Sequence, residues 1–146
     1  RRKIPPTRAH TSFALKASAA LVKDGQATKL ATTGAWEFEF YHSPIPSKRR
    51  GRFIYPYFAI WADHNSGSSI RTQLLDPRSH IQALQELFLN MVLDRECLPD
   101  FVLVRRAEAR AILAPLAQSL GFGMQMRMNL SAIDSQNRAI LNHLIY

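Results

Sequence analysis

The sequence has very little of what small secreted or metal-stabilised domains use to hold themselves together. It contains a single cysteine, Cys97, among 146 residues. One cysteine forms neither an internal disulfide nor a multi-cysteine zinc site, so the chain must fold by burying apolar side chains. A hydrophobic fraction of 47% is sufficient for one ordinary domain. The cysteine usage also suits a reducing, cytoplasmic compartment.

Long apolar runs and several common catalytic motifs are missing as well. Charge or proline interrupts every apolar stretch before the roughly 18 residues that a membrane span needs, so we expect no membrane association. The six glycines are isolated, which excludes a glycine-rich phosphate loop. The five histidines show neither HxH nor HExxH spacing, and no serine nucleophile elbow is present.

Acidic residues are scarce only in the first third of the chain. Residues 1–52 contain eleven Lys or Arg and three acids, whereas residues 53–146 contain eight arginines and eight acids, so the net charge of +8 is wholly N-terminal. This asymmetry indicates an anionic partner, which could be DNA, RNA or an acidic protein surface, or else a solubilising tail on a neutral domain. The cations predicted to contact phosphates are Arg1, Arg2, Lys3, Arg8, Lys48, Arg49, Arg50 and Arg52.

The run 48–52 is the most prominent local feature. It places four cations within five residues, directly after a proline-containing segment that is typical of an exposed connection. Phe53, Tyr55 and Tyr57 follow, and such rings stack on bases where they face solvent. The apolar residues around them instead favour packing within a strand.

The N-terminal residues 1–34 are expected to form a basic arm and a short helix outside a main domain at 35–146. Pro5 and Pro6 favour an extended arm, and the apolar spacing after Ser12 predicts a helix that ends at Asp24-Gly25. Since the chain begins with arginine rather than methionine, we expect it to be part of a longer protein.

Hydrophobic periodicity predicts three strands followed by alternating helices and strands. Trp36 to Tyr41 alternates in the manner of a half-buried strand, and two further strands would complete an antiparallel meander. Ser131 and Asp134 are expected to cap the last helix. The predicted strands are 36–41, 53–62, 69–75, 101–104 and 123–129, and the helices after the meander begin near 79, 107 and 131.

This order of elements resembles the ribonuclease H-like fold of ribonucleases H, retroviral-type integrases and many transposases. The stretches Trp36–Glu39, Ala62–Ile70 and Leu98–Val104 carry the resemblance, which extends over residues 35–145. The same stretches are similar to an uncharacterised bacterial domain family. The resemblance implies an α+β domain with a five-stranded mixed sheet flanked by helices.

Enzymes of that fold hold two Mg²⁺ or Mn²⁺ ions with carboxylates on the first strand and just after the fourth. In this chain the resemblance offers Glu39, Asp63, Glu108 and Asp134 as catalytic candidates, with Glu39 and Glu108 as metal ligands. However, Arg105 and Arg106 follow the fourth strand, where guanidinium groups repel metal ions. We therefore expect no catalytic residues and no metal or other cofactor, and we predict that one of these arginines pairs with Glu37 or Glu39.

Three functions are compatible with the sequence. The favoured one is a non-catalytic binding module that contacts nucleic acid through its basic N-terminal third. The first alternative is a metal-dependent nuclease or an integrase-like strand transferase. The second is a structural or assembly domain of a longer protein, with its aromatic strand edge as the interface.

Overall fold

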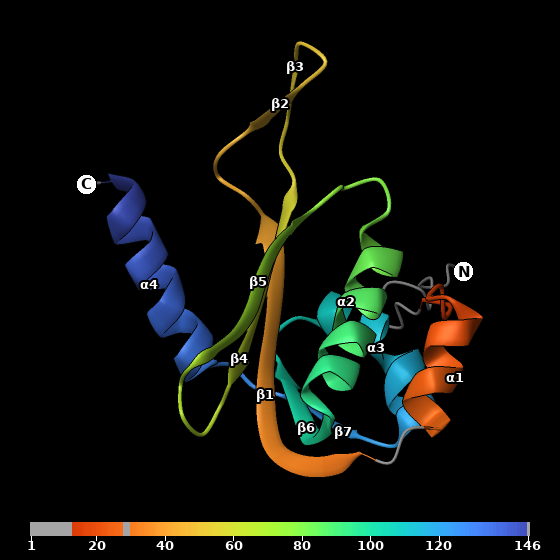
Figure 1. Cartoon of the computed structure of the whole chain (residues 1–146). Coiled ribbons are helices and arrows are strands. Elements are labelled where there is room, and N and C mark those ends of the chain that lie inside the picture. The colour runs from red at the N-terminus through yellow and green to blue at the C-terminus, as the bar shows by residue number, and fades with distance from the viewer. Residues whose placement is uncertain (1–12, 28–29, 146) are drawn as a thin grey trace, which may run out of the picture.

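A computed structural model describes residues 13–27 and 30–145, which form a five-stranded mixed sheet flanked by helices (Figure 1). The strand order is β5-β4-β1-β6-β7. β1 pairs antiparallel with β4 and parallel with β6, and β7 continues the sheet in parallel. These strands are β1 (Ala31–His42), β4 (Tyr57–Asp63), β5 (Ser69–Leu75), β6 (Cys97–Val104) and β7 (Gly123–Met126). The predicted α+β fold with a five-stranded mixed sheet flanked by helices is confirmed.

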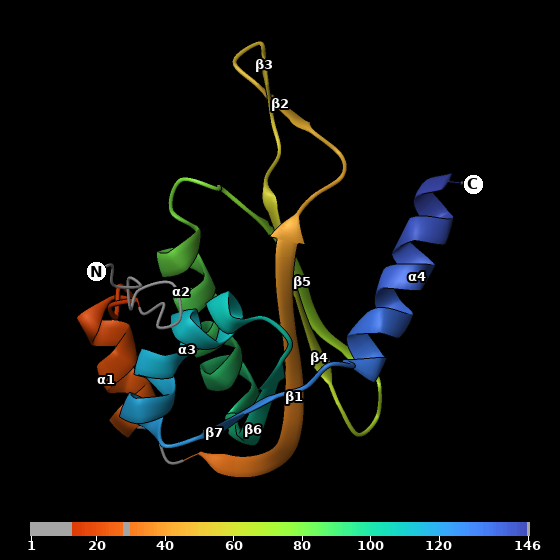
Figure 2. The ribbon, with the colours of Figure 1, turned by 180° about the vertical axis from the view of Figure 1, so that it is seen from behind.

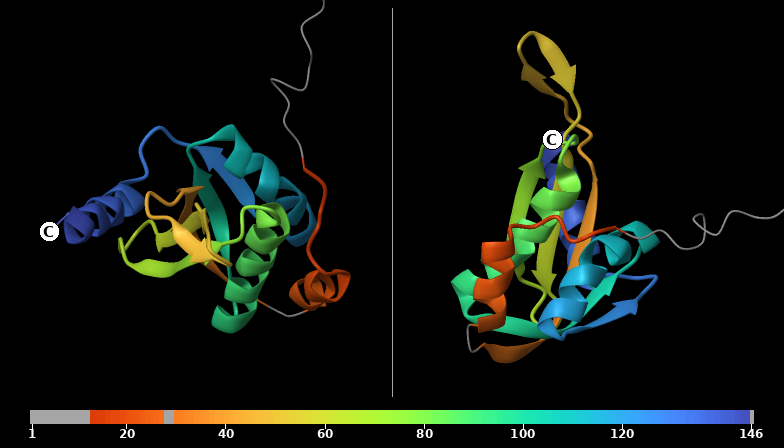
Figure 3. Two further views of the ribbon diagram at one scale, coloured as in Figure 1. Left: turned by 90° about the horizontal axis from the view of Figure 1, so that it is seen from above. Right: turned by 90° about the vertical axis from the view of Figure 1, so that its right-hand side faces the viewer.

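The helices are divided unequally between the two faces of the sheet. α1 (Ala19–Ala27), α2 (His80–Arg95) and α3 (Ala107–Leu120) lie on one face, and α4 (Ser131–Ile145) lies on the other (Figures 2 and 3). The larger core lies between the sheet and the first three helices, and a smaller one lies under the start of α4. Within the described residues, no helix is long and apolar enough to cross a membrane.

β1 is the central strand, and its residues 36–40 are buried on both faces. Trp36 and Phe38 face the larger core, and their rings contact Trp61 of β4 with centroids 6.1 and 4.4 Å away. Glu37 and Glu39 point to the opposite face, yet they are only 0% and 7% exposed. The predicted alternation is therefore right, but the prediction of a half-buried strand is wrong, because other elements also cover the second face.

The segment from 47 to 63 departs from the prediction of one exposed connection and one long strand. β2 (Ser47–Arg49) and β3 (Arg52–Ile54) form a separate hairpin that projects beyond the sheet (Figure 3). Its two-residue turn has positive φ at Arg50 and Gly51 (54° and 75°), the combination that type I′ hairpin turns require. Pro56 separates β3 from β4, because proline has no N–H to continue the ladder.

The aromatic strand β4 is not at an edge of the sheet. It lies between β5 and β1, so the expected interface along an aromatic strand edge has no counterpart here. The edges of the sheet are β5 and β7. A partner strand would have to pair with one of those.

The N-terminal helix begins later than predicted, at Ala19, and continues through Gly25. Gly25 allows close packing, because a Cβ there would lie 3.3 Å from Leu120 Cδ2 of α3. The buried amide of Gln85 holds the preceding segment by accepting hydrogen bonds from the Lys16 and Ala17 amides at 2.7 and 3.1 Å. The proposed division at residues 34 and 35 stays a prediction. The expected arm, with Arg1, Arg2, Lys3 and Arg8, lies outside the described residues.

Candidate functional site

The chemically distinctive residues gather where the parallel strands end. β1, β6 and β7 run in the same direction, so their carboxyl ends lie at one edge of the sheet, where open α/β sheets usually bind ligands. Glu39 lies near the end of β1, Arg105 and Arg106 follow β6 directly, and Asp134 lies in the first turn of α4. We call these four residues the arginine-carboxylate cluster.

Arg105 is the centre of the cluster. Its Nε donates to Glu39 Oε2 at 3.3 Å, and its Nη2 and Nη1 donate to Asp134 Oδ1 and Oδ2 at 2.8 and 3.2 Å. The Asp134 contact is the bidentate geometry that guanidinium groups favour. It raises the pKa of Arg105 and lowers the pKa of Asp134, and both shifts are due mainly to this side-chain hydrogen bond. The contacts therefore favour the charged form of each partner.

Arg106 binds the other oxygen of the same glutamate. Its Nε donates to Glu39 Oε1 at 3.1 Å, its Nη2 donates to the Phe40 carbonyl, and its guanidinium lies 4.6 Å from the centroid of the Phe40 ring. The predicted pairing of one arginine with a first-strand glutamate is confirmed, and in fact both arginines pair with Glu39. The strict alternation expected of them does not hold, because β6 ends at Val104 and both residues lie in the bend that follows.

The other two candidate acids, Glu108 and Asp63, do not belong to the arginine-carboxylate cluster. Glu108 makes two long contacts, with its Oε1 lying 3.9 Å from Arg106 Nη1 and its Oε2 lying 4.0 Å from His80 Nε2. Asp63 accepts hydrogen bonds from the Ser66 amide and hydroxyl, which is the turn role expected for it. Asp63 lies opposite Trp36 in the β1–β4 ladder, and Trp36 is three residues before Glu39 in the chain. Asp63 is therefore roughly 10 Å along the sheet from Glu39.

The cluster does not suit a divalent cation. The Arg105 guanidinium lies between the Glu39 and Asp134 carboxylates, and Arg106 contacts the other oxygen of Glu39. A metal ion at that point would have to displace or approach two positive charges. In the part of the chain that the structure describes, no three His, Cys, Asp or Glu side chains are grouped closely enough to hold a metal.

A second buried carboxylate, Glu37, was predicted as a possible partner of an arginine, but its contacts are with other groups. It accepts hydrogen bonds from the Ala132 and Ile133 amides at 3.2 and 2.9 Å, and its Oε2 lies 2.6 Å from His64 Nδ1. Glu37 thus caps the N-terminus of α4 from another element, where a negative charge is favourable. The predicted cap by Ser131 and Asp134 differs from this arrangement, because the Ala132 and Ile133 amides bind Glu37 and the Asp134 carboxylate is bound mainly by Arg105.

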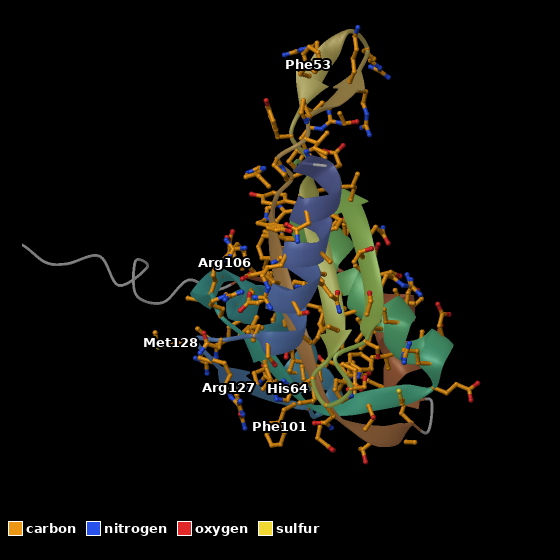
Figure 4. All side chains as sticks on the ribbon, turned by 90° about the vertical axis from the view of Figure 1, so that its left-hand side faces the viewer. Phe53, His64, Phe101, Arg106, Arg127 and Met128 are labelled. Carbon is orange, nitrogen blue, oxygen red and sulfur yellow. The ribbon has the colours of Figure 1, made fainter. Side chains whose placement is uncertain are left out.

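The β2–β3 hairpin is the second charged feature near this edge, and it follows β1 directly. Lys48, Arg49, Arg50 and Arg52 are all exposed on it, which agrees with their predicted exposure. Arg49 binds Asp76 at 3.3 Å. Over the described ranges, the other three cations make no ion pair with a carboxylate. Figure 4 shows Phe53 on the hairpin, far from Arg127 and Phe101 at the other end of the molecule.

Comparison with solved structures defines the class of fold. The HTLV-2 integrase catalytic core domain, in complex with magnesium, aligns with a TM-score of 0.54 and 14% identity over 77% of this chain and 70% of its own. The simian T-cell lymphotropic virus intasome, in complex with PP2A regulatory subunit B56 gamma, aligns at 0.52 and 14% identity over 75% of this chain but only 38% of that chain. At these identities the likeness shows the ribonuclease H-like fold.

The chain belongs to the family described as Domain of unknown function (DUF6930), whose sequence model matches residues 25–141. None of the curated proteins matches the chain.

Proposed function

We propose that this chain is a non-catalytic nucleic-acid-binding domain built on a ribonuclease H-like scaffold. The observation that carries the proposal is the β2–β3 hairpin, which projects beyond the sheet and exposes four cations; among the described residues, only Arg49 of these is paired with a carboxylate. Cations held outward on a narrow hairpin can each approach a phosphate and release its counterions. Such contacts bind nucleic acid with little sequence selectivity.

The arginine-carboxylate cluster supports the non-catalytic part of the proposal. The integrase and intasome neighbours share this fold, and one of them is described as a magnesium complex. In this chain Arg105 and Arg106 neutralise Glu39 and Asp134, two of the carboxylates that the resemblance offered as catalytic candidates. The cluster then acts as a structural tie between β1, β6 and α4. Metal-dependent hydrolysis or strand transfer is the competing function.

The binding experiment compares two triple variants that carry the same net charge. One replaces Lys48, Arg50 and Arg52 with Gln, and the control replaces Lys23, Arg95 and Arg110, which are exposed on α1, α2 and α3. Fluorescence anisotropy with labelled oligo-dT and with a DNA duplex is recorded between about 50 and 200 mM salt. The hairpin variant should lose affinity, and its salt slope should fall by about 2 for oligo-dT and by about 2.7 for the duplex. The control should bind like the unmodified chain.

Each competing function has its own result in this design. Equal losses in the two variants would show that only overall charge matters, and absence of binding at low salt would remove nucleic acid as the partner. Binding of an acidic protein such as prothymosin, but of no oligonucleotide, would favour an acidic protein surface. Cleavage of the labelled DNA with Mg²⁺ or Mn²⁺ would overturn the non-catalytic assignment.

A further inference from the structure

We infer that the hairpin recognises single-stranded rather than double-stranded nucleic acid, with a base stacked on Phe53 and phosphates held by the surrounding arginines. This inference rests on the proposed function and specifies its ligand. It is drawn from the exposure of one aromatic ring, the pairing across the hairpin and a hollow beside it.

Phe53 is 70% exposed, although it is a large apolar side chain. It lies directly opposite Lys48 in the hairpin, so the two side chains share one face of the ribbon. Each strand here has only three residues and no core that needs the ring. A flat apolar surface beside a cation matches the base and the phosphate of one nucleotide unit.

The exposed ring distinguishes between the two forms of nucleic acid. In a duplex the faces of the bases are covered by their neighbours, and only their edges are accessible in the grooves. In a single strand an unstacked base can lie flat against an aromatic side chain, whatever its identity. Phe53 can therefore contribute stacking energy to single strands, whereas Lys48 and the arginines contribute to both forms.

A hollow of about 460 Å³ beside Phe53 offers room for the adjoining phosphates. Arg50, Arg52 and Phe53 line it from the hairpin, and Arg78 lines it from the turn before α2. Its volume lies within the range of about 300–1,000 Å³ that small ligands occupy.

Asp76 connects the two sides of this hollow. Its Oδ2 lies 2.8 Å from Arg78 Nη2 and 3.3 Å from Arg49 Nη1. The hydrogen bonds from Arg78 hold the pKa of Asp76 well below its usual range. One ionised carboxylate thus links the hairpin to the turn, and Arg50 and Arg52 remain available for phosphates.

The test uses the full chain with labelled oligo-dT, oligo-rU and a DNA duplex of the same length. Phe53→Ala should weaken binding of both single strands by about tenfold and leave duplex binding unchanged, whereas Phe53→Trp should retain or increase single-strand affinity. Phe101→Ala serves as the control, because Phe101 is also exposed but lies at the opposite end of the molecule (Figure 4). Circular dichroism should show that Phe53→Ala keeps the melting temperature.

The outcomes separate this inference from the function on which it rests. Equal affinity for duplex and single strands, with no effect of Phe53→Ala, would overturn the single-strand assignment and leave nucleic-acid binding intact. Equal losses from Phe53→Ala and Phe101→Ala would also overturn it. No binding to any of the three probes at low salt would instead overturn the proposed function itself.

Discussion

At the residue scale, Arg105 connects two carboxylates, whereas the sequence predicted only that one of the two arginines pairs with a glutamate of the first strand. Its guanidinium bridges Glu39 of β1 and Asp134 of α4, which are 95 positions apart in the chain. A lysine at this position would supply one point charge rather than a planar fork of donors, so it could not make the same pair of contacts. The geometry accounts for an arginine at the end of β6 without any catalytic role.

Asp134→Asn should destabilise the domain in a pH-dependent way. The folded-state pKa of Asp134 lies below its ordinary value because of Arg105, so its ionised form adds stability above the unfolded pKa of about 3.9. That contribution is lost as the pH falls through the lowered folded-state pKa. Because the pair is partly exposed, the expected loss at pH 7 is about 1 kcal/mol.

Urea unfolding of the original chain and the Asp134→Asn variant from neutral pH to below about pH 3 measures this difference. The two free energies of unfolding should converge as the pH falls below about 4. A difference that is constant with pH would mean that the Arg105 contact does not depend on the charge of Asp134.

At the element scale, α4 is held to the sheet by a carboxylate from another strand. Glu37 is completely buried and accepts two amide hydrogen bonds from the first turn of α4, in addition to its contact with His64. The negative charge of a carboxylate at a helix N-terminus is favourable, because the helix dipole places partial positive charge there. α4 is the one described helix on its face of the sheet. The cap therefore helps to hold in place the helix that covers this face.

Glu37→Gln should therefore loosen the start of α4. Removing the charge from a buried acceptor of several hydrogen bonds is expected to cost about 1–3 kcal/mol in the free energy of unfolding. Hydrogen exchange should be faster at the Ala132 and Ile133 amides than in the original chain. Glu96→Gln provides the matched control, because Glu96 is exposed at the end of α2. Unchanged exchange at both amides would contradict the capping role.

At the scale of the whole molecule, the cations form two sets, one that stabilises the fold and one that is available for binding. The cations of the arginine-carboxylate cluster are matched by carboxylates, whereas those of the hairpin are largely unmatched. The first set ties secondary-structure elements together, and the second is accessible to an anionic partner. One fold can carry different functions, because function resides in particular sites rather than in the fold.

Mg²⁺ or Mn²⁺ should leave the melting temperature of the original chain unchanged, because the cluster already has its own cations. Arg105→Asp removes the guanidinium between Glu39 and Asp134 and adds a carboxylate, so Mn²⁺ should stabilise that variant. At ten times the Kd, mass action gives about 1.4 kcal/mol, which corresponds to several degrees in Tm. Differential scanning fluorimetry measures both chains. A metal-dependent rise in the original chain would show that the cluster accepts a metal.

Local sequence pattern determined most elements of this fold. The alternation of Trp36, Phe38 and Phe40 predicted β1, and the change to helical spacing after Asp76-Pro77 predicted α2, because these periodicities depend only on neighbours along the chain. The pattern also predicted a pairing of Arg105 or Arg106 with β1. It missed the β2–β3 hairpin, since the Arg50-Gly51 turn is a weak signal within a highly charged run.

Only the tertiary structure decided what the buried acids do. Glu37 and Glu39 belong to the same strand and have the same side chain, yet one caps α4 and the other binds two arginines. Apart from the adjacent Phe40 amide, their partners lie between 27 and 96 residues away, so no local spacing encodes these contacts. The packing of α4 over the second face of the sheet brings those partners together, and it buries two acids that periodicity alone predicted to face solvent.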